Sequence, residues 1–193
     1  MLELPISPID LKDLQETTAL MLRHNLEIHE INCVRKHLSK VKGGRLAQMC
    51  KAQGVVLVVS DIIDDDLHSV GSAPLYADAS TFEQTKEILE SKNLFQIIPD
   101  SVKSVLQKGL DGEIEETPST PLERVKHIII ASNKLALEQA VLSAKSKGLS
   151  VRKITQAMQG EVGEMVNTMF KTLHACEEEC LIFGGECTVE VQG

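Results

Sequence analysis

The sequence contains no tryptophan, one tyrosine and four phenylalanines, so aromatic residues make up only 3% of its 193 residues. This scarcity argues against a surface that binds single-stranded nucleic acid, since such surfaces stack bases on aromatic rings. Basic residues are also few. The 20 Lys and Arg residues are outnumbered by 28 Asp and Glu, which gives a net charge of −8. Nonspecific binding to nucleic acid or to an anionic membrane is therefore not expected.

Long apolar runs are absent as well, because no stretch approaches the roughly 20 residues that cross a bilayer. The first residues, Met-Leu-Glu-Leu-Pro, lack the basic start and apolar core of a signal peptide. The five cysteines are an odd number in a chain without secretory features, so we expect reduced thiols. A cytoplasmic location follows as the expectation, with no membrane partner.

The basic side chains that are present gather in residues 32–47. This segment breaks at Gly43–Gly44 and resumes at Arg45. Twin glycines permit a positive φ and a close approach to a ligand, and a helix that begins after them offers unpaired N–H groups to an anion. The pattern favours a phosphate or carboxylate site. A solvated basic helix face that ends at the two glycines is the alternative.

A helix is predicted from residue 28 to about 38, with Ile31, Val34 and Leu38 on its inner face. Arg35 and, beyond the helix, Lys42 would then lie off that face, where a ligand reaches them.

A run of apolar, mostly β-branched residues at 55–61 predicts a strand buried on both faces. Ser60 and Asp61 fall at its carboxyl end, where open α/β sheets place their ligand sites. Asp61 and the acidic residues that follow, Asp65 among them, are suited to Mg²⁺, which takes one or two carboxylates together with nucleotide phosphates. A solvated acidic loop is the alternative.

A second buried strand, residues 125–130, leads through Ser132 and Asn133 into a helix over 134–147. A strand followed by small residues and a helix N-terminus is a common way to hold an anion. Asn133 also suits the N-cap of that helix.

Further strands are predicted over 149–155 and 180–183. The helix predicted over 161–176 carries regularly spaced Met, Val and Phe residues that are typical of a core. This alternation of strands and helices predicts an α/β fold, a three-layer α/β/α sandwich with a mostly parallel sheet.

The segment N-x-V-R-K-H-L-S-x-x-K-G-G-R-L-A at 32–47 resembles the signature of the glycerate kinase family, whose C-terminal part is called MOFRL and whose older name is hydroxypyruvate reductase. Shorter matches follow in the family order: S-D at 60–61, S-x-P at 72–74, D-x-S-T at 78–81, E-T-P at 116–118, I-I-x-S-N at 129–133 and G-G-E-x-T-V at 184–189.

The resemblance implies a glycerate kinase that transfers the γ-phosphoryl group of ATP to D-glycerate with Mg²⁺ and yields 2-phosphoglycerate. It implies catalytic roles for Arg35, Lys42 and Asp61, and a metal site at Asp61 and Asp65. The residues implied in substrate or phosphate binding are Asn32, Gly43, Gly44, Arg45, Ser132, Asn133, Gly184, Gly185 and Glu186.

The sequence departs from the family pattern at several positions. Asp64 and Ala73 replace glycines, Leu75 replaces a threonine, and Ala131 replaces a glycine in I-I-G-S-N. The match covers the central half of a family member, residues 1–193, with the MOFRL region starting at 184. We therefore expect complementary segments or a homodimer as partners.

Two other functions remain open at this stage. One is a non-catalytic fragment that binds an organic anion or phosphate. The other is an NAD(P)-dependent hydroxypyruvate reductase, which has little support because no G-x-G-x-x-G follows any predicted strand.

Overall fold

The computed structural model describes residues 2–154 and 158–189. The chain divides into two compact units. Unit 1 consists of residues 1–56 and 66–128, and unit 2 of residues 57–65 and 129–193. The sequence had suggested part of one α/β domain. Residues 190–193 of the expected MOFRL region lie outside the described residues.

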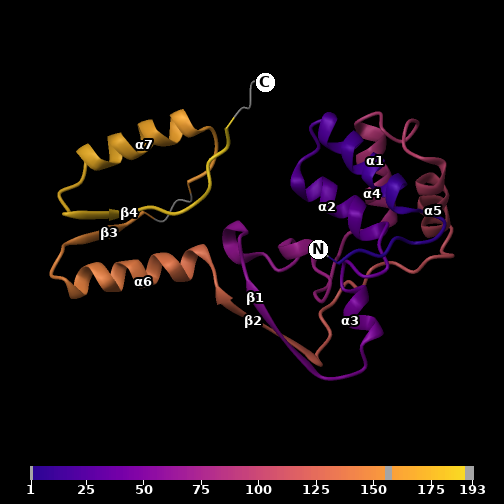
Figure 1. Cartoon of the computed structure of the whole chain (residues 1–193), viewed down its shortest axis with the longest axis horizontal. Helices are drawn as coiled ribbons and strands as arrows, with labels where there is room; N and C mark the ends of the chain where they lie inside the picture. The colour runs from indigo at the N-terminus through magenta and orange to yellow at the C-terminus, as the bar shows by residue number, and fades with distance from the viewer. Residues whose placement is uncertain (1, 155–157, 190–193) are drawn as a thin grey trace. The chain divides into compact units, whose positions relative to one another are not determined.

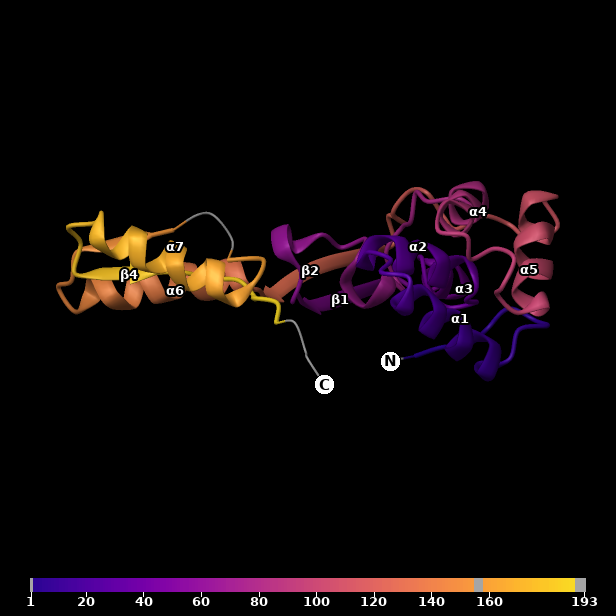
Figure 2. The ribbon, with the colours of Figure 1, turned by 90° about the horizontal axis from the view of Figure 1, so that it is seen from above.

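Unit 1 is a cluster of helices (Figure 2). Its helices are α1 (Leu11–Arg23), α2 (Ile28–His37), α3 (Arg45–Met49), α4 (Phe82–Ser91) and α5 (Asp100–Leu110). Its core is formed by apolar side chains of α1, α2, α4 and α5, which include Leu14, Met21, Ile31, Val34, Phe82, Leu89, Val102, Val105 and Leu106. The predicted inner face of α2 is therefore confirmed.

Side-chain caps mark the starts of two of these helices. Asp10 caps α1, because its carboxylate accepts a hydrogen bond from the Asp13 N–H. Thr81 caps α4 and forms a capping box with Gln84. In each case the cap is the last residue with extended backbone, which the sequence pattern alone does not locate.

Strands β1 (Gly54–Val59) and β2 (Val125–Ala131) are neighbours in one two-stranded sheet. Gly54 N donates to Arg124 O at 2.9 Å and Ser60 N to Ala131 O at 2.8 Å, so the bonds advance in the same direction along both strands, as in a parallel pair. The expected burial of β1 is wrong, because only Val58 is buried and the side chains on either side of it are exposed. No other described element covers them.

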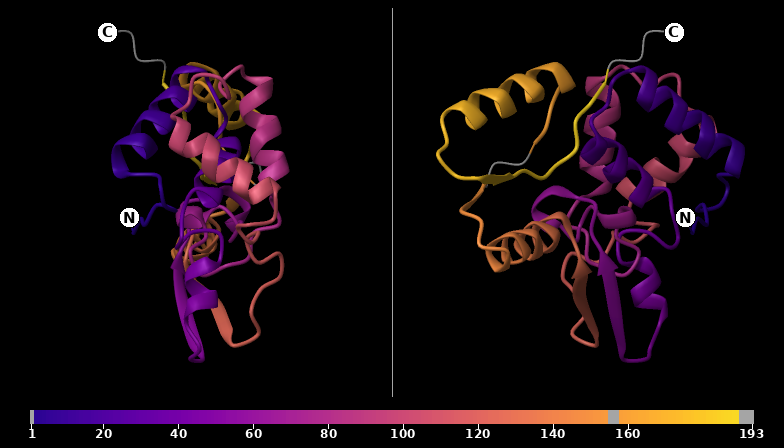
Figure 3. Two further views of the ribbon diagram at one scale, coloured as in Figure 1. Left: turned by 90° about the vertical axis from the view of Figure 1, so that its right-hand side faces the viewer. Right: turned by 60° about the vertical axis from the view of Figure 1, so that its left-hand side comes forward.

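Unit 2 contains α6 (Asn133–Ser146), β3 (Val151–Lys153), α7 (Val162–His174) and β4 (Cys180–Ile182). Strands β3 and β4 pair in parallel, with Val151 opposite Cys180. Figure 1 and the right panel of Figure 3 show this pair between α6 and α7, which is an α/β/α layering within the unit. The predicted α/β class with parallel strands is confirmed, although the described strands form two separate pairs.

Helix α7 contradicts one expectation about the core. Its apolar side chains keep the predicted helical spacing, but none of them is buried, and Phe170 and Leu173 are 58% and 54% exposed. Among the described residues, no helix is both long and apolar enough to cross a membrane.

Candidate functional site

The signature segments of unit 1 meet in a buried polar cluster centred on Asp78. Lys36 Nζ lies 3.1 Å from Asp78 Oδ1, with both side chains buried. Hydroxyl groups of Ser80 and Thr117 donate to the same carboxylate at 2.8 and 3.1 Å. Burial alone would raise the pKa of Asp78, but the charge of Lys36 and these hydrogen bonds outweigh it and lower the pKa. The carboxylate is therefore fully satisfied and acts as a structural anion.

His37, the residue after Lys36 in α2, is fully buried and belongs to the same cluster. Its Nδ1 lies 2.9 Å from Cys33 O and its Nε2 lies 3.1 Å from Glu116 Oε2. Both partners are acceptors, an arrangement that favours the protonated ring, and the pKa of His37 is raised although burial alone would lower it. Glu116 also accepts the Phe82 N–H at the start of α4. His37 and Glu116 therefore join α2, α4 and the E-T-P segment.

Gly43 and Gly44 contradict the expected phosphate cradle. Their N–H groups already donate to Ser72 O at 3.2 Å and Ala73 O at 2.7 Å. A Cβ on Gly43 would lie 2.8 Å from Thr117 Cγ2, and one on Gly44 would lie 2.8 Å from Tyr76 O. The backbone and side chains of the protein itself therefore occupy the space beside these glycines, where an anion was expected. The φ angles of Gly43 and Gly44 are 56° and 80°.

Lys42 also differs from expectation. Its side chain is 1% exposed, and its ammonium lies 3.5 Å from Glu3 Oε2 and donates to Leu2 O at 3.4 Å. Burial and the nearby charge of Arg35 lower the pKa of Lys42 against the attraction of Glu3. A buried, paired ammonium does not reach a ligand in this structure, so a catalytic role for Lys42 is not supported. Arg35 is half-buried, and its catalytic role stays a prediction.

Asn32 belongs to the same cluster and is buried. Its side-chain oxygen accepts a hydrogen bond from Ser72 Oγ at 3.0 Å. With Lys36 and Asp78 it lines a cavity of about 370 Å³. A role for Asn32 in binding a ligand stays a prediction.

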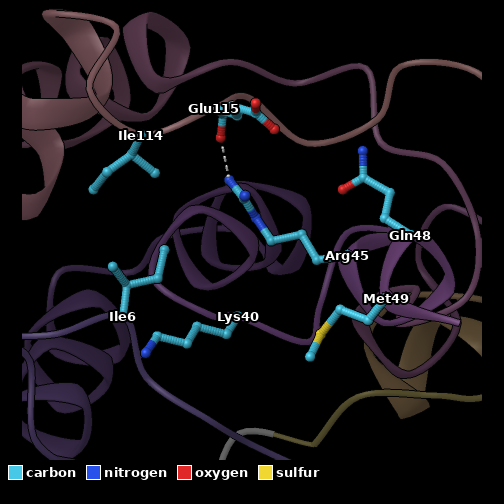
Figure 4. Close-up of a pocket in the computed structure, with 7 residues that line it drawn as sticks. All are labelled: Ile6, Lys40, Arg45, Gln48, Met49, Ile114 and Glu115. Atoms are coloured by element: carbon cyan, nitrogen blue, oxygen red, sulfur yellow. Dashed lines mark hydrogen bonds between the residues drawn. The ribbon is translucent and has the colours of Figure 1, made fainter.

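Arg45 extends away from the twin glycines into a different cavity, of about 480 Å³ (Figure 4). Its Nη2 donates to Glu115 O at 2.6 Å, while its Nε is buried without a hydrogen-bond partner. Arg45 thus does not join Gly43 and Gly44 in a phosphate cradle.

In unit 2, the carboxyl ends of β1 and β2 bring together two predicted positions. The hydrogen bond from Ser60 N to Ala131 O holds the two strand ends side by side. Asp61 follows Ser60 and is exposed. Ser132 follows Ala131 and caps the 14-residue helix α6 by accepting the Leu135 N–H at 3.3 Å. The cap is therefore Ser132 and not Asn133.

The expected metal positions, Asp61 and Asp65, lie on the segment after β1. Across residues 2–154 and 158–189, no three His, Cys, Asp or Glu side chains gather in a way that holds a metal ion. Asp61 is an exposed carboxylate without an ion pair among these residues, which fits the open, oxygen-only coordination that Mg²⁺ prefers. A site that combines Asp61 with nucleotide phosphates stays a prediction.

Asn133 and the Gly184–Gly185–Glu186 turn lie together in unit 2. A Cβ on Gly184 would lie 2.5 Å from Asn133 Oδ1, so the glycine makes room for the amide. Gly185 has φ of 144°, and Glu186 N donates to Met158 O at 2.9 Å. The turn is thus hydrogen-bonded to the backbone of Met158. Its role in binding a ligand stays a prediction.

The replaced family glycines behave in two ways. Asp64 and Ala73 both adopt positive φ, 62° and 48°, which is the conformation that glycine takes most easily. Ala131, in contrast, lies in β2 with an ordinary φ, so its methyl group is accommodated. The loop therefore holds two non-glycine residues in a backbone conformation that glycine adopts more easily.

Asp78, Glu116 and Thr117 belong to the motifs D-x-S-T and E-T-P, but the motifs alone do not reveal the role of these residues in the cluster. Long-range partners separated by 39 to 79 residues cannot be paired from one sequence.

Comparison with known proteins agrees with this arrangement. A family model described as "Domain of unknown function (DUF4147)" matches residues 1–107. The chain is 40% identical to glycerate 2-kinase of Pyrococcus horikoshii and 34% identical to D-glycerate 2-kinase of Thermotoga maritima, over 99% of its length in both cases. It is 35% identical to human glycerate kinase over 86% of its length.

Solved structures give the same relationship. The chain matches a Pyrococcus horikoshii crystal structure with a TM-score of 0.84 at 39% identity, and the glycerate kinase of Thermotoga maritima with a TM-score of 0.81 at 33% identity. Each match covers 99% of this chain and 46% of the other chain. The chain thus spans less than half of the length of these relatives. The chain carries the DUF4147 domain and belongs to the glycerate kinase family.

Proposed function

We propose that this chain takes part in the ATP-dependent phosphorylation of D-glycerate to 2-phosphoglycerate. The observation that carries the proposal is the shared carboxyl edge of β1 and β2 in unit 2. There an exposed carboxylate, Asp61, lies next to the N-terminus of α6. The names of relatives at 34–40% identity supply the substrate class.

Phosphoryl transfer needs positioned groups and neutralisation of negative charge that spreads over the phosphoryl oxygens. The first N–H groups of α6 have no partner within the helix, and its dipole favours an anion at that end. Ser132 fixes this helix start through its bond to Leu135 N. These groups would hold the carboxylate of glycerate or a phosphate of ATP.

Asp61 has one of two roles at this edge, as a ligand of Mg²⁺ or as an acceptor that orients the reacting hydroxyl of glycerate. Mg²⁺ supplies charge neutralisation at the phosphates when it is bound. Within unit 1, Arg35 is proposed as a charge clamp because the family resemblance gives it a catalytic role, and the residue is half-buried rather than enclosed.

Phosphorus NMR of the chain with Mg²⁺, ATP and D-glycerate tests the proposal, with a sample lacking glycerate as the control. A new phosphoglycerate resonance is the expected result, and its shift distinguishes phosphorylation at the 2-position from the 3-position. Asp61→Asn should weaken the Mg²⁺ dependence far more than Asp66→Asn, since Asp66 is already bonded to Ser69 Oγ at 2.7 Å.

A thermal unfolding series with ATP and with D-glycerate separates the alternatives. Stabilisation by either ligand without turnover would favour an organic-anion-binding fragment. Loss of NADH absorbance with hydroxypyruvate would favour a reductase. The absence of both turnover and ligand-induced stabilisation would overturn the proposal.

A further inference from the structure

A loop of unit 1, residues 66–80, docks on the turn that follows α2. Its carbonyl groups at Ser72 and Ala73 accept hydrogen bonds from the N–H groups of Gly43 and Gly44 at 3.2 and 2.7 Å. The backbone is strained at these two positions, because Ser72 and Ala73 have φ of 63° and 48°, values that residues other than glycine rarely adopt. Such a conformation persists only where the surrounding contacts impose it. The contacts that hold the 66–80 loop therefore decide whether it stays docked.

Tyr76 supplies a second contact of the 66–80 loop. Its ring contacts two imidazoles in T-shaped arrangements, with centroid distances of 4.9 Å to His68 at 78° and 4.9 Å to His127 at 88°. His68 belongs to the loop itself, and its Nδ1 lies 2.9 Å from Ala77 O. His127 belongs to β2. The contact between Tyr76 and His127 therefore attaches the loop to a different element of unit 1.

His127 is suited to respond to pH. Its Nε2 is buried and has no hydrogen-bond partner among the described residues. Burial lowers the pKa of His127 below 6.5, because it outweighs hydrogen bonds with the backbone of Leu75 and Val125. The neutral ring therefore prevails at pH 7. Protonation would leave a cationic ring with a buried N–H that has no acceptor, which costs more than one unmet group on a neutral ring.

The charged groups on the elements packed against His127 do not offset this cost, because they are cations or already have partners. These groups are Arg124 and Lys126 around β2, and Asp66 and Asp78 in the 66–80 loop. Asp78 is paired with Lys36 at 3.1 Å, and Asp66 accepts the Ser69 hydroxyl at 2.7 Å. Strand β1, which pairs with β2, consists of Gly-Val-Val-Leu-Val-Val and carries no titratable side chain.

We propose that Tyr76 and His127 form a pH-sensitive latch, which keeps the 66–80 loop docked while the imidazole is neutral and releases the loop when the imidazole is protonated. Release lets water reach the imidazolium, and it frees the N–H groups of Gly43 and Gly44 from the loop. The latch lies within unit 1 and does not rest on the proposed phosphoryl transfer.

Tyrosine fluorescence of the full chain tests the latch, because Tyr76 is its only tyrosine and it contains no tryptophan. Acrylamide quenching at about pH 7.5 and about pH 5, on either side of the histidine range, measures how far solvent reaches this ring. Amide exchange at Gly43 and Gly44, corrected for the intrinsic exchange rate, measures the hydrogen bonds to the loop. At the lower pH we expect stronger quenching and at least about tenfold less protection of both amides. Equal or greater protection there would overturn the proposal, since the protonated ring would then hold Tyr76 more tightly.

Two variants identify the titrating group. His127→Gln keeps a polar side chain that cannot be protonated, so it should abolish the pH response. His29→Gln is the matched control, because His29 lies on α2 with 71% of its side chain exposed, and it should retain the response. His37 cannot account for the response, because its raised pKa stabilises the fold as the pH falls. A response that persists in His127→Gln would overturn the proposal.

A measurement on the unaltered protein needs no variant to fold. The imidazole resonances of His127 should titrate with a midpoint below pH 6.5. Protection of the Gly44 amide should fall with the same midpoint, because one protonation event releases the loop. If His127 titrated without a change at Gly44, the latch would be excluded.

Discussion

Lys36 and Asp78 form an ion pair at 3.1 Å in which the side chains are 7% and 4% exposed. The pair joins α2 to the segment before α4 across 42 positions of sequence. Two of the family motifs, V-R-K-H and D-x-S-T, therefore meet through one buried contact. Their presence in the sequence reflects how unit 1 is held together.

Loss of the lysine charge should be strongly destabilising. Lys36→Met leaves the Asp78 carboxylate buried without its counter-ion, so we expect the free energy of unfolding to fall by about 3–5 kcal/mol. Urea denaturation measures this. The control is Lys103→Met, whose partner Asp100 lies at 2.9 Å with 96% of its side chain exposed. That change should cost less than about 1 kcal/mol, and equal effects would contradict the structural role.

The buried imidazolium of His37 predicts a pH dependence of stability. Burial alone would lower the pKa of His37, but its contacts with Cys33 and the charge of Asp78 outweigh burial and raise the pKa above 6.5. The resulting stabilisation is complete below pH 6.5 and is lost as the pH rises through the raised pKa of His37 in the folded protein. Cys33 acts in the opposite direction. Burial alone would raise the pKa of its thiol, but hydrogen bonds from His37 and Thr85 lower it.

Comparison of the unchanged protein with His37→Gln isolates the histidine. In the unchanged protein, the His37 contribution to the free energy of unfolding should fall with rising pH above 6.5, by at most about 1.4 kcal/mol per pH unit. Urea titrations across neutral and alkaline pH measure the slope. Adding His37→Gln should remove most of it. If both proteins gave the same slope, His37 would not be the titrating group.

The twin glycines should be sensitive to a single methyl group. Gly44→Ala places a Cβ 2.7 Å from Pro118 Cγ and 2.8 Å from Tyr76 O, on a backbone with φ of 80°. We expect a loss of at least about 2 kcal/mol in thermal or urea unfolding. Gly54→Ala is the matched control, because nothing lies within 4 Å of its Cβ, and it should change stability by about 0.5 kcal/mol or less. If Gly44→Ala kept normal stability but bound phosphate more weakly, that result would support the phosphate site at Gly43 and Gly44 that the sequence predicts.

Arg35 is the residue of unit 1 on which the kinase proposal makes the sharpest kinetic prediction. Arg35→Ala should lower kcat/KM for phosphorylation by about 10²–10³, as loss of a group that stabilises the transition state does. Lys108→Ala, an exposed change on α5, serves as the control for general charge effects. An unchanged kcat/KM in Arg35→Ala would remove Arg35 from the reaction.

The exposed apolar face of α7 should promote association. Its exposed apolar side chains form surface that a complementary segment or a second copy would cover. Sedimentation should therefore show concentration-dependent association, which Phe170→Glu reduces. Lys171→Glu, which introduces the same acidic side chain at a polar position of the same helix, should have little effect. Association that both variants alter equally would place the contact elsewhere.

Local patterns in the sequence determined most of the secondary structure. Apolar spacing located α2 and α7 to within a few residues, and the run at 55–61 located β1, because helix and strand periodicity depend on neighbouring residues. The family resemblance rested on motif order, and the relatives confirm it. The shared strand edge of Asp61 and Ser132 was also expected, since it follows from parallel pairing.

The tertiary structure alone decided which motif residues are buried partners and which face solvent. Lys42 and Gly44 carry the same sequence signal as Arg35, but the N-terminal segment covers the first and the Tyr76 backbone occupies the space beside the second. Burial of α7 likewise depends on what packs against it, and not on its own periodicity. These outcomes depend on contacts between residues far apart in the chain, and the free energy of such contacts is not encoded in any local pattern.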